Sequence, residues 1–543
     1  RKAEIYYYDI GDYHDRQTKL NIIQNLKSIE SMESIFTRIT PNKDYDWINQ
    51  RDYSFMAYIP LGHRDTKLKS LPIQKPTPKI DPQVLESGYI DIFEIFSQGV
   101  ITGKDSWSFN FSKQKLSENI QLSLQTYNAE RELLYKNSSH ELCSDLTKIS
   151  WTGGLREKAQ SNKEMFFKPQ NIKVCLYRPF QKAYLYYDNG YNHSHYQMDK
   201  IYPFDNLNNI AISLTDRGSS KEFSALASRY IHERHFVANA QSFPLYYYER
   251  IESSQAQKGS GTQSTIDFTT EAKQNLDSPQ SGGMDIEQNT AYFRRKDAIR
   301  DEALQRFQEV YNDSTITKEA MFYYIYALLN HPVYKEKYRD NLSKMIPRIP
   351  FVKDFWGLEA KGRELANLHL NYEGYAKECE SLRVFACLAQ DVKDLSLALT
   401  DPTLLTQGID ICSVAQAGLE TLGDEDFTIT KLTFGKDKKK AKDTSVIVFN
   451  EKIHIINIPK KAYEYIINGK SAIEWIMDRY QVSTDKASYI TNDPNLYESS
   501  EGALKGLRGG RYVLELLLSV IAMSVKSVGI IESIATIDIT QSQ

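Results

Sequence analysis

The hydrophobic pattern changes period several times along this chain, which predicts a mixture of strands and helices. The aromatic run at residues 5–10 ends at Gly11 and predicts a strand and a turn, and a helix is expected over residues 15–29. Ser112 is a predicted N-cap, after which apolar residues recur at helical spacing. The apolar positions of that helix are Leu116, Ile120, Leu124, Tyr127 and Leu134.

Short strands followed by longer helices are predicted for the middle of the chain. The strand-like patterns lie at residues 174–177, 184–187, 210–214 and 243–248. Thr317 is the predicted cap of a helix that His331 and Pro332 stop. Two more helices are expected over residues 334–342 and 355–368.

The last part of the chain returns to strands and ends in helices. Residues 446–449 and 453–456 flank a short polar turn, which predicts a hairpin. Two helices are expected over residues 463–476 and 514–521, and no repeat of fixed period is present. The predicted fold class is therefore α+β, with several domains, mixed sheets and helical subdomains.

Two segments without hydrophobic periodicity divide the chain. Residues 61–82 carry four prolines and several lysines, and residues 251–290 are rich in Ser, Gln, Gly, Thr and Asp, so we expect a connector and a disordered insertion. The predicted units are residues 1–60, a linker at 61–89, a mixed region at 90–250, the insertion at 251–295, a helical region at 296–425 and a C-terminal hairpin-and-helix region at 426–543.

Length and composition narrow the class of protein. A chain of 543 residues with 41% hydrophobic and 25% charged residues is expected to fold into several globular domains. Its formal net charge of -3 means that any nucleic-acid binding must use local basic faces. The five scattered cysteines favour a reducing cytosol, and the longest apolar run, residues 513–525, is too short to span a bilayer. The chain opens on Arg1 rather than Met and is expected to be a piece of a longer protein.

Residues 177–187 are the strongest candidate for recognising a charged partner. Arg178 and Lys182 stand among five aromatic residues, and Pro179 favours an extended backbone at Arg178. A cation held on a stiff aromatic segment suits contact with nucleic acid. The alternative is a core strand whose arginine pairs with a buried carboxylate.

Three other basic features are candidates for DNA contact, each with a structural alternative. Lys104 follows two glycines in a loop that either approaches a phosphate or is a tight turn. Arg217 lies in a polar loop and either reads a base edge, pairs with Asp216 or faces solvent. Residues 431–442 contain six lysines and one acid, which form either a phosphate contact or a solvated loop. The phosphate candidates in that run are Lys438, Lys439 and Lys440.

Motifs for catalysis or metal binding are incomplete. His193 and His195 lack a third ligand nearby in sequence, and His232 and His235 are spaced one residue short of a zincin motif. Residues 468–471 end like a phosphate loop but lack its upstream glycine. The chain contains no GxSxG, no NPPY-type tetrad and no glycine-rich nucleotide loop, so we assign no catalytic, cofactor-binding or metal-binding residue.

Several sequence runs in a fixed order resemble the C-terminal part of type ISP restriction-modification enzymes. The first runs are Tyr6-Tyr7-Tyr8-Asp9-Ile10-Gly11-Asp12-Tyr13, Ser97-Gln98-Gly99-Val100-Ile101-Thr102-Gly103-Lys104-Asp105 and Tyr177-Arg178-Pro179-Phe180. The later ones are Gln241–Glu249, Ile346–Pro350, Leu368–Glu373, Asn468–Trp475 and Asn492–Asn495. The resemblance covers most of the chain outside the polar insertion.

The resemblance implies that residues 1–60 are the tail of an adenine-N6 methyltransferase domain and that most of the rest recognises the DNA target. The N-terminal strand would complete an α/β methyltransferase sheet, and S-adenosylmethionine would bind upstream, in the full-length enzyme. The expected partners are double-stranded DNA and the methyltransferase and helicase domains of the same polypeptide. Lys104 departs from the arginine usual in that family and loses bidentate geometry.

The leading hypothesis is sequence-specific recognition of duplex DNA, so that an upstream domain can flip and methylate an adenine. One alternative is an inter-domain scaffold that couples a helicase to the methyltransferase and reads little DNA. A second alternative is an independent hydrolase, which would need a nucleophile–base pair that the sequence spacing does not reveal.

Overall fold

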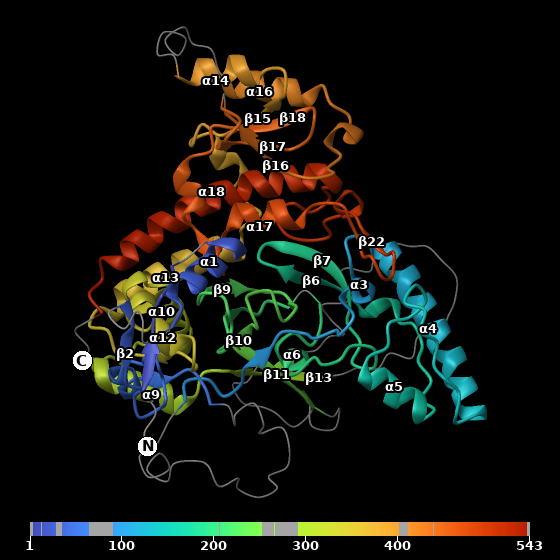
Figure 1. The fold of residues 1–543 in the computed structure, drawn as a ribbon, viewed down its shortest axis with the longest axis horizontal. Helices are drawn as coiled ribbons and strands as arrows, with labels where there is room; N and C mark the ends of the chain where they lie inside the picture. Colours follow the sequence, from blue (N-terminus) through green and yellow to red (C-terminus); the bar gives the residue numbers. More distant parts are fainter. Residues whose placement is uncertain are drawn as a thin grey trace, which may run out of the picture.

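The computed structural model contains helices and several small antiparallel sheets, which confirms the α+β class (Figure 1). It describes residues 4–11, 14–28, 35–63, 91–205, 207–251, 265–266, 292–400, 411–437 and 439–539. The predicted linker at 61–89 and the predicted insertion at 251–295 lie largely outside these residues. Among the described parts of those two segments, Leu61 is fully buried and residues 292–297 form a strand.

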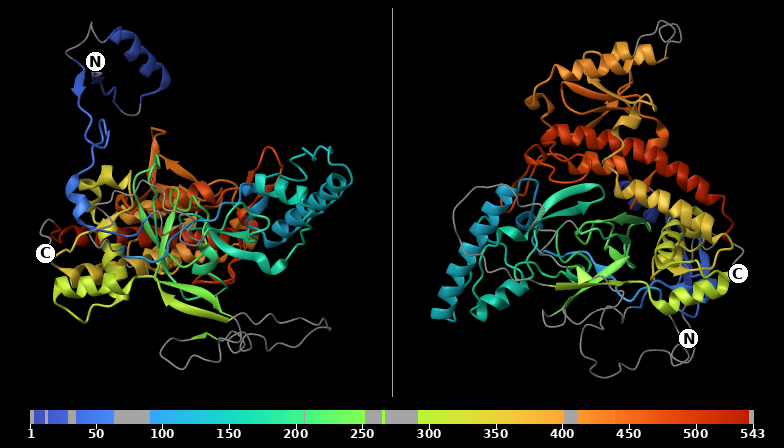
Figure 2. Two further views of the ribbon diagram at one scale, coloured as in Figure 1. Left: turned by 90° about the horizontal axis from the view of Figure 1, so that it is seen from below. Right: turned by 180° about the vertical axis from the view of Figure 1, so that it is seen from behind.

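The N-terminal unit stands clear of the body (Figure 2). Strands β1 (Ile5–Tyr7) and β2 (Thr37–Ile39) pair antiparallel, with Ile5 opposite Ile39. Helix α1 (Arg16–Leu26) begins after Asp15, whose carboxylate accepts a hydrogen bond from the Thr18 N–H at 2.7 Å, and none of its residues is buried. The chain then enters the body through the 3-10 helix η2 (Tyr53–Ala57) and strand β3 (Ile59–Pro60).

Three sheets form the middle of the molecule. One sheet has the order β4 (Ser97–Gln98), β10 (Gln241–Pro244), β8 (Ala211–Leu214) and β9 (Ala225–Ser228), and all of its residues are buried. The second has the order β5 (Phe109–Asn110), β7 (Gln181–Tyr186) and β6 (Ile172–Arg178). The third has the order β11 (Tyr246–Ile251), β13 (Tyr292–Asp297) and β12 (Thr265–Ile266). The strand predicted at 243–248 is thus two strands, β10 and β11, in different sheets.

A helical arm projects from this part of the molecule (Figure 1). Its long helix α4 (Lys113–Lys136) begins where predicted, because the Ser112 hydroxyl accepts a hydrogen bond from the Lys115 N–H at 3.2 Å. The apolar stripe faces inward, with Leu116 and Ile120 fully buried. The shorter helices α3 (Asp105–Ser108) and α5 (Gly153–Gln160) pack on α4, whereas α6 (Met198–Ile201) packs on β11.

The predicted helical region is built around a close crossing of two helices. Helix α10 (Lys318–Asn330) begins after Thr317 as predicted, and it packs on α13 (Phe355–Leu370). At Gly362 a Cβ would lie 1.9 Å from the Tyr323 carbonyl oxygen, so only glycine allows this approach. The other elements are α9 (Asp301–Tyr311), α11 (Pro332–Lys337), α12 (Arg339–Leu342) and strand β14 (Arg348–Ile349), which pairs with β3.

A small α/β unit lies at the top of the molecule in Figure 1. Its sheet has the order β15 (Phe385–Leu388), β18 (Ile453–Ile456), β17 (Lys442–Val448) and β16 (Thr433–Lys436), with helices α14 (Val392–Thr400) and α16 (Ile411–Glu420) beside it. The predicted hairpin is confirmed, since Ile447 pairs with Ile455. Strand β15 falls in the segment predicted to be helical.

The helix predicted over residues 463–476 is wrong. Asn468 and Gly469 have φ angles of 50° and 82°, which make a tight turn between strands β19 (Ile466–Ile467) and β20 (Lys470–Ser471). Helix α17 (Ala472–Arg479) begins only at Ser471, whose side chain forms a capping box with Glu474. The remaining short elements are η4 (Pro169–Asn171), η6 (Ala376–Cys379), η7 (Asp424–Phe427), η8 (Lys460–Tyr463), η9 (Pro494–Leu496), β21 (Ser483–Thr484) and β22 (Thr491–Asn492).

Helix α18 (Gly509–Ala535) crosses the centre of the molecule and packs on α13 and α17. It is longer than the apolar run identified in the sequence. By length and composition alone it could cross a membrane, but 67% of its most apolar window is buried inside the protein, as in a core helix. It therefore serves as packing surface for both the helical region and the small unit.

A buried ion pair joins three of these parts. The Lys182 ammonium on β7 lies 2.9 Å from both carboxylate oxygens of Glu373, which follows α13, and the two residues are 1% and 5% exposed. The Tyr512 hydroxyl of α18 donates a third hydrogen bond to Glu373 at 2.9 Å. Burial opposes the charge on Lys182, but Glu373 raises the pKa of Lys182 above its ordinary value.

We expect Lys182→Met to lower the free energy of unfolding by about 3–5 kcal/mol, because Glu373 would stay buried without a cation. Adding Glu373→Leu should recover much of this loss, since no charge then remains buried. Urea titration followed by intrinsic fluorescence measures both variants. The control is Lys115→Met, which breaks the exposed pair with Glu118 and should change stability by less than about 1 kcal/mol. A double variant as unstable as the single one would contradict this account of the pair.

Candidate nucleic-acid interface

Asn468 connects three loops into one surface. Its side-chain amide donates to the Thr215 hydroxyl and to the Glu222 carbonyl, each at 2.9 Å, and its oxygen accepts from the Ala238 N–H at 2.9 Å. The residue is 3% exposed and has a φ of 50°, which asparagine tolerates better than most residues. We call the surface formed by residues 215–224, 232–240 and 468–470 the loop face.

Arg217 is exposed on the loop face. Asp216 does not pair with its guanidinium; the Asp216 carboxylate accepts hydrogen bonds from the Arg217 N–H at 2.8 Å and from the Gln241 amide at 2.9 Å. Within the described ranges, the Arg217 side chain has no ion-pair or hydrogen-bond partner. Lys221 in the same loop is also exposed. A fixed loop thus presents a free guanidinium, which suits contact with a base edge or a phosphate.

Glu233, on the loop face, partly neutralises the charge of Arg178. Its guanidinium lies 2.6 Å from Glu233 and 4.0 Å from the centre of the Tyr177 ring, and its side chain is 14% exposed. Burial raises the pKa of Glu233 to about 7 despite the attraction of Arg178. Glu233 therefore becomes protonated just below neutral pH, which leaves the charge of Arg178 uncompensated. The alternative of an arginine paired with a buried carboxylate is the one found in this structure.

Two further arginines that the sequence reasoning missed lie beside Arg178. Arg234 follows Glu233 directly in the sequence. Burial lowers the pKa of Arg479 on α17, and the nearby charge of Arg178 lowers it further. The Nε atoms of Arg234 and Arg479 are buried and have no hydrogen-bond partner among the described residues. Lys470, in the turn after Asn468, pairs with Asp478. The Asn-Gly turn was the sequence signal that could have located this cluster.

Lys104 and Lys182 do not face solvent, so the expected DNA contacts of these two lysines do not fit the structure. Lys104 is 5% exposed, donates to the Tyr191 carbonyl at 2.8 Å and lies 3.5 Å from the centre of the Tyr191 ring. Its glycine loop is a structural turn, because a Cβ at Gly99 would lie 2.6 Å from the Glu233 carbonyl oxygen. Lys182 is held by Glu373. Both amines therefore lie in the interior of the fold.

The lysine run lies away from the loop face. Lys439 and Lys440 are exposed in the turn between β16 and β17, while Lys438 lies outside the described residues. Figure 1 places their sheet on the opposite side of α18 from β9 and β10. Lys439 and Lys440 are accordingly candidates for a separate phosphate contact, not for the same one as Arg217.

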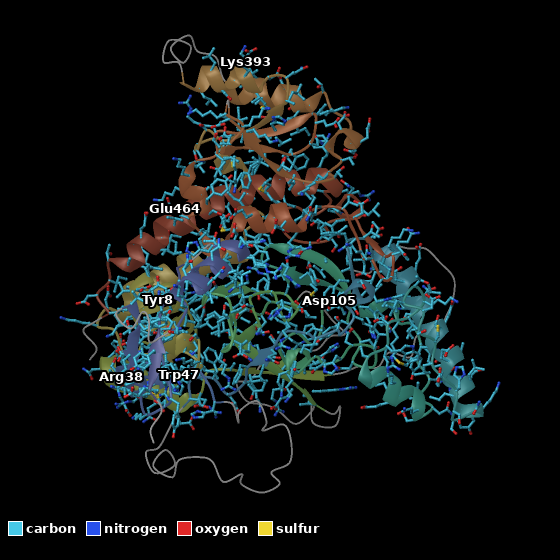
Figure 3. The ribbon with its side chains drawn as sticks, viewed as in Figure 1. Tyr8, Arg38, Trp47, Asp105, Lys393 and Glu464 are labelled. Atoms are coloured by element: carbon cyan, nitrogen blue, oxygen red, sulfur yellow. The ribbon has the colours of Figure 1, made fainter. Side chains whose placement is uncertain are left out.

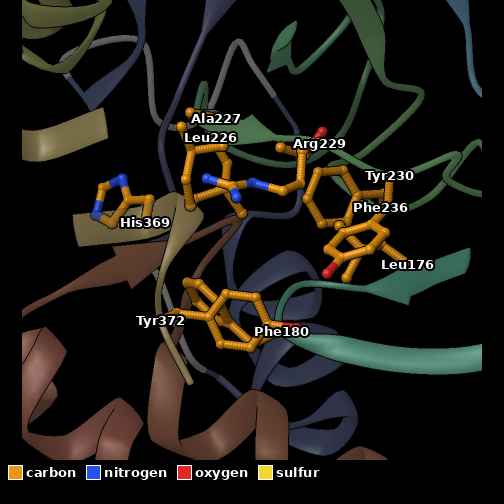
Figure 4. Close-up of a pocket in the computed structure, with 11 residues that line it drawn as sticks. Leu176, Phe180, Leu226, Ala227, Arg229, Tyr230, Phe236, His369 and Tyr372 are labelled. Carbon is orange, nitrogen blue, oxygen red and sulfur yellow. The ribbon is translucent and has the colours of Figure 1, made fainter. Parts of the chain in front are cut away.

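Among the described residues, two histidines contact serine hydroxyls and all of these side chains are buried; His232 contacts both Ser213 and Ser242. The Ser242 hydroxyl lies 2.5 Å from His232 Nε2, and the Ser527 hydroxyl lies 3.0 Å from His369 Nε2. Burial lowers the pKa of His232 to about 4 and that of His369 to about 3. The cavity that His369 lines holds about 10 Å³, enough for one water molecule (Figure 4). No substrate can reach either pair, so the structure does not support a hydrolase built on them.

Of the other histidines considered in the sequence, His193 and His235 are exposed, and His195 belongs to the fold. His195 is 2% exposed, stacks on Tyr187 with the ring centres 3.8 Å apart and lies 3.3 Å from Asp199. Across the part of the chain that the structure describes, no three His, Cys, Asp or Glu residues are grouped to hold a metal ion.

The comparisons with known proteins give one family and several similar structures. The model of the Type ISP C-terminal specificity domain matches residues 91–515, while none of the curated proteins matches. A nuclease-deletion mutant of the Type ISP restriction-modification enzyme LlaGI, in complex with a DNA substrate mimic, is 28% identical with a TM-score of 0.69. The ATP-dependent Type ISP restriction-modification enzyme LlaBIII bound to DNA is 27% identical with a TM-score of 0.70.

A DrdV–DNA complex shares the fold at 24% identity and a TM-score of 0.67. The alignments cover 99%, 99% and 97% of this chain, but only 40%, 28% and 43% of LlaGI, LlaBIII and DrdV respectively. The chain therefore spans less than half the length of each of these proteins.

We expect Asn468→Ala to loosen the loop face, because three side-chain hydrogen bonds are lost at a cost of about 1–3 kcal/mol. Hydrogen–deuterium exchange should accelerate in residues 215–224 and 236–240 and stay unchanged in the small sheet at 442–456. The control is Asn457→Ala, at a residue that also has a positive φ, 59°, but makes one side-chain bond, to the Arg383 carbonyl. Unchanged exchange in both loops would show that Asn468 does not hold them.

Proposed function

The chain belongs to the family of Type ISP C-terminal specificity domains, and we propose that it recognises a specific sequence of double-stranded DNA for a restriction-modification enzyme. The observation that carries this proposal is the exposed guanidinium of Arg217 on a loop fixed by Asn468. The similar structures of LlaGI and LlaBIII, each above 25% identity, contain a DNA substrate mimic and DNA respectively, which supports it.

Different arginines on and beside the loop face are suited to base reading and to phosphate contact. Arg217 can form bidentate hydrogen bonds to a guanine edge in the major groove, which distinguishes one base pair from the others. We assign phosphate contacts to Arg234, to Arg479 and, when its pair with Glu233 opens, to Arg178, which would fix the register of the protein on the duplex. Below neutral pH, protonation of Glu233 would strengthen this contact by freeing Arg178.

We propose further that the chain acts beside methyltransferase and helicase domains of the same polypeptide, in the cytoplasm, and serves methylation of adenine at N6. The N-terminal unit supports this arrangement, because within the described residues β1 and β2 pair only with each other and α1 buries no residue. Aromatic residues of this unit remain exposed, with Trp47 at 55% and Tyr8 at 38% (Figure 3). An upstream sheet would cover them.

S-adenosylmethionine would bind in that upstream domain. The present sequence has neither a glycine-rich loop nor an NPPY-type tetrad. This chain's own residues would bind and orient the duplex, and no step of methyl transfer is assigned to them.

The test of the proposal begins with selection of a random duplex library on the protein, followed by sequencing of the bound fraction. Enrichment of one sequence supports target recognition. Equal retention of all sequences would contradict it and would favour the inter-domain scaffold, which binds DNA little and reads none.

Arg217→Ala is expected to weaken binding to the selected duplex by about 1–3 kcal/mol and to relax one position of the site. Fluorescence anisotropy with the selected duplex and a scrambled one measures this. Arg306→Ala, an exposed arginine on α9, is the matched control and should bind both duplexes as the unmodified protein does. Equal weakening on both duplexes would rule out base reading by Arg217.

Lys439→Ala and Lys440→Ala are expected to weaken binding to all sequences alike. Each lysine that neutralises a phosphate should contribute about 0.9 to the slope of log affinity against log salt concentration, so each variant should flatten that slope. The control is Lys393→Ala, an exposed lysine on α14 of the same small unit (Figure 3). A slope unchanged by both substitutions would remove this run from the DNA contact.

A further inference from the structure

A short hairpin outside the loop face carries an exposed tyrosine at its tip. Strands β21 and β22 pair with Thr484 opposite Thr491. Tyr489, in the loop that joins the two strands, is 72% exposed. Within the part of the chain that the structure describes, no aromatic or cationic side chain lies against its ring, and its hydroxyl makes no hydrogen bond. Both faces of this ring are therefore open to a partner.

The backbone of Tyr489 is held in a conformation that large side chains rarely adopt, with a φ of 56°. Hydrogen bonds keep the loop in this shape. The Asp485 carboxylate accepts from the N–H and the hydroxyl of Ser488, each at 2.8 Å, and the Asp485 carbonyl accepts from the Tyr489 N–H at 2.9 Å. An exposed ring adds little to the core, so a tyrosine at this strained position is better explained by binding than by stability.

The surroundings of the ring are polar. Tyr489 is the only large apolar side chain that is exposed between residues 483 and 492, all of which the structure describes. Lys486 in the same loop is exposed and forms no ion pair with any described residue. A surface that docks another protein would be expected to have a contiguous apolar patch. A single ring beside a free cation instead suits nucleic acid, which offers flat bases and phosphates.

One short segment connects the hairpin to the arginines beside the loop face. The Tyr177 hydroxyl, next to Arg178, donates to Asp105 at 3.1 Å, where α3 begins. Strand β5 follows α3, and its Asn110 side chain donates to the Thr491 carbonyl at 3.1 Å, which places β22 beside α3 (Figure 1). Even fully extended, this segment would span roughly 20 Å, the length of about six base pairs. One duplex is therefore long enough to contact both places.

We propose that the tip of this hairpin is a further DNA contact, at which Tyr489 stacks on a base that has left the duplex stack and Lys486 binds a neighbouring phosphate. The base must be unstacked, because inside a duplex both of its faces are covered by its neighbours. The inference rests on the proposed function, since it takes the partner to be DNA. It adds the residue that holds an unstacked base and the chemical reason for its exposure.

Fluorescence anisotropy with two duplexes of the same sequence tests the proposal on the whole chain. One duplex is fully paired, and the other carries a single unpaired adenine. We expect the unmodified chain to bind the second at least about fivefold more tightly, because stacking on Tyr489 is then not offset by the cost of unstacking. Binding that is not sequence-specific allows the chain to place the unpaired base at the tip whatever the surrounding sequence.

Three variants identify the ring as the cause. Tyr489→Asn should abolish the preference for the unpaired base, whereas Tyr489→Phe should keep it because the ring remains. Asparagine tolerates a positive φ, so the hairpin should stay folded in Tyr489→Asn, and thermal unfolding checks this. The matched control is Tyr135→Asn, which removes a 73% exposed tyrosine from α4 and should leave the preference unchanged.

Lys486→Ala separates the phosphate contact from the stacking contact. It should weaken binding to both duplexes alike and flatten the slope of log affinity against log salt concentration, while the preference for the unpaired base remains. A slope and affinities equal to those of the unmodified chain would remove Lys486 from the contact and overturn that part of the proposal.

The proposal for Tyr489 is overturned if the unmodified chain binds the two duplexes equally well, or if the preference persists in Tyr489→Asn. The same titrations measure binding to the fully paired duplex. Intact binding to that duplex without a preference contradicts the hairpin contact and leaves the proposed function standing, whereas no binding to either duplex contradicts both.

Discussion

The contact on which the architecture depends is the ion pair between Lys182 and Glu373. Two charges out of water are tolerated only when each finds enough partners, and here the carboxylate receives the ammonium and the Tyr512 hydroxyl. The three residues come from a strand, the end of a helix and α18, so the pair fixes how these parts meet. A hydrophobic contact at the same place would bind the parts but would not specify their relative position as narrowly.

Local signals in the sequence predicted the helices and strands well where an N-cap or a turn sets their boundaries. Ser112 and Thr317 begin helices as expected because a hydroxyl at the N-cap is a short-range device. The partners of the cations could not be predicted in this way. Glu233 is 55 residues from Arg178 and Glu373 is 191 residues from Lys182, and only the tertiary fold brings those carboxylates near. The aromatic segment chosen as a binding site is therefore mainly structural, whereas Arg217 is exposed.

Residues 468–471 do not form a phosphate loop, but they have a structural role. Residues 468–471 resemble the end of a phosphate loop, yet their role is a tight turn whose first residue ties neighbouring loops together and whose last residue caps α17. The spacing of apolar residues predicted a helix across this turn, because the apolar residues on both sides of the turn recur at helical intervals. The positive φ angles of Asn468 and Gly469 overrule that spacing, since they end any helix at this point.

The position of α18 has a consequence for how the chain acquires its structure. This helix is the last long element in sequence, yet it supplies a buried face to α13 and α17 and a hydroxyl to Glu373. When the residues before α18 have been made, the buried faces of α13 and α17 are still uncovered. The Glu373 carboxylate then also lacks the hydrogen bond from the Tyr512 hydroxyl. The buried faces of α13 and α17 can therefore be covered only after residues 509–535 have been made, and until then they remain exposed apolar surface.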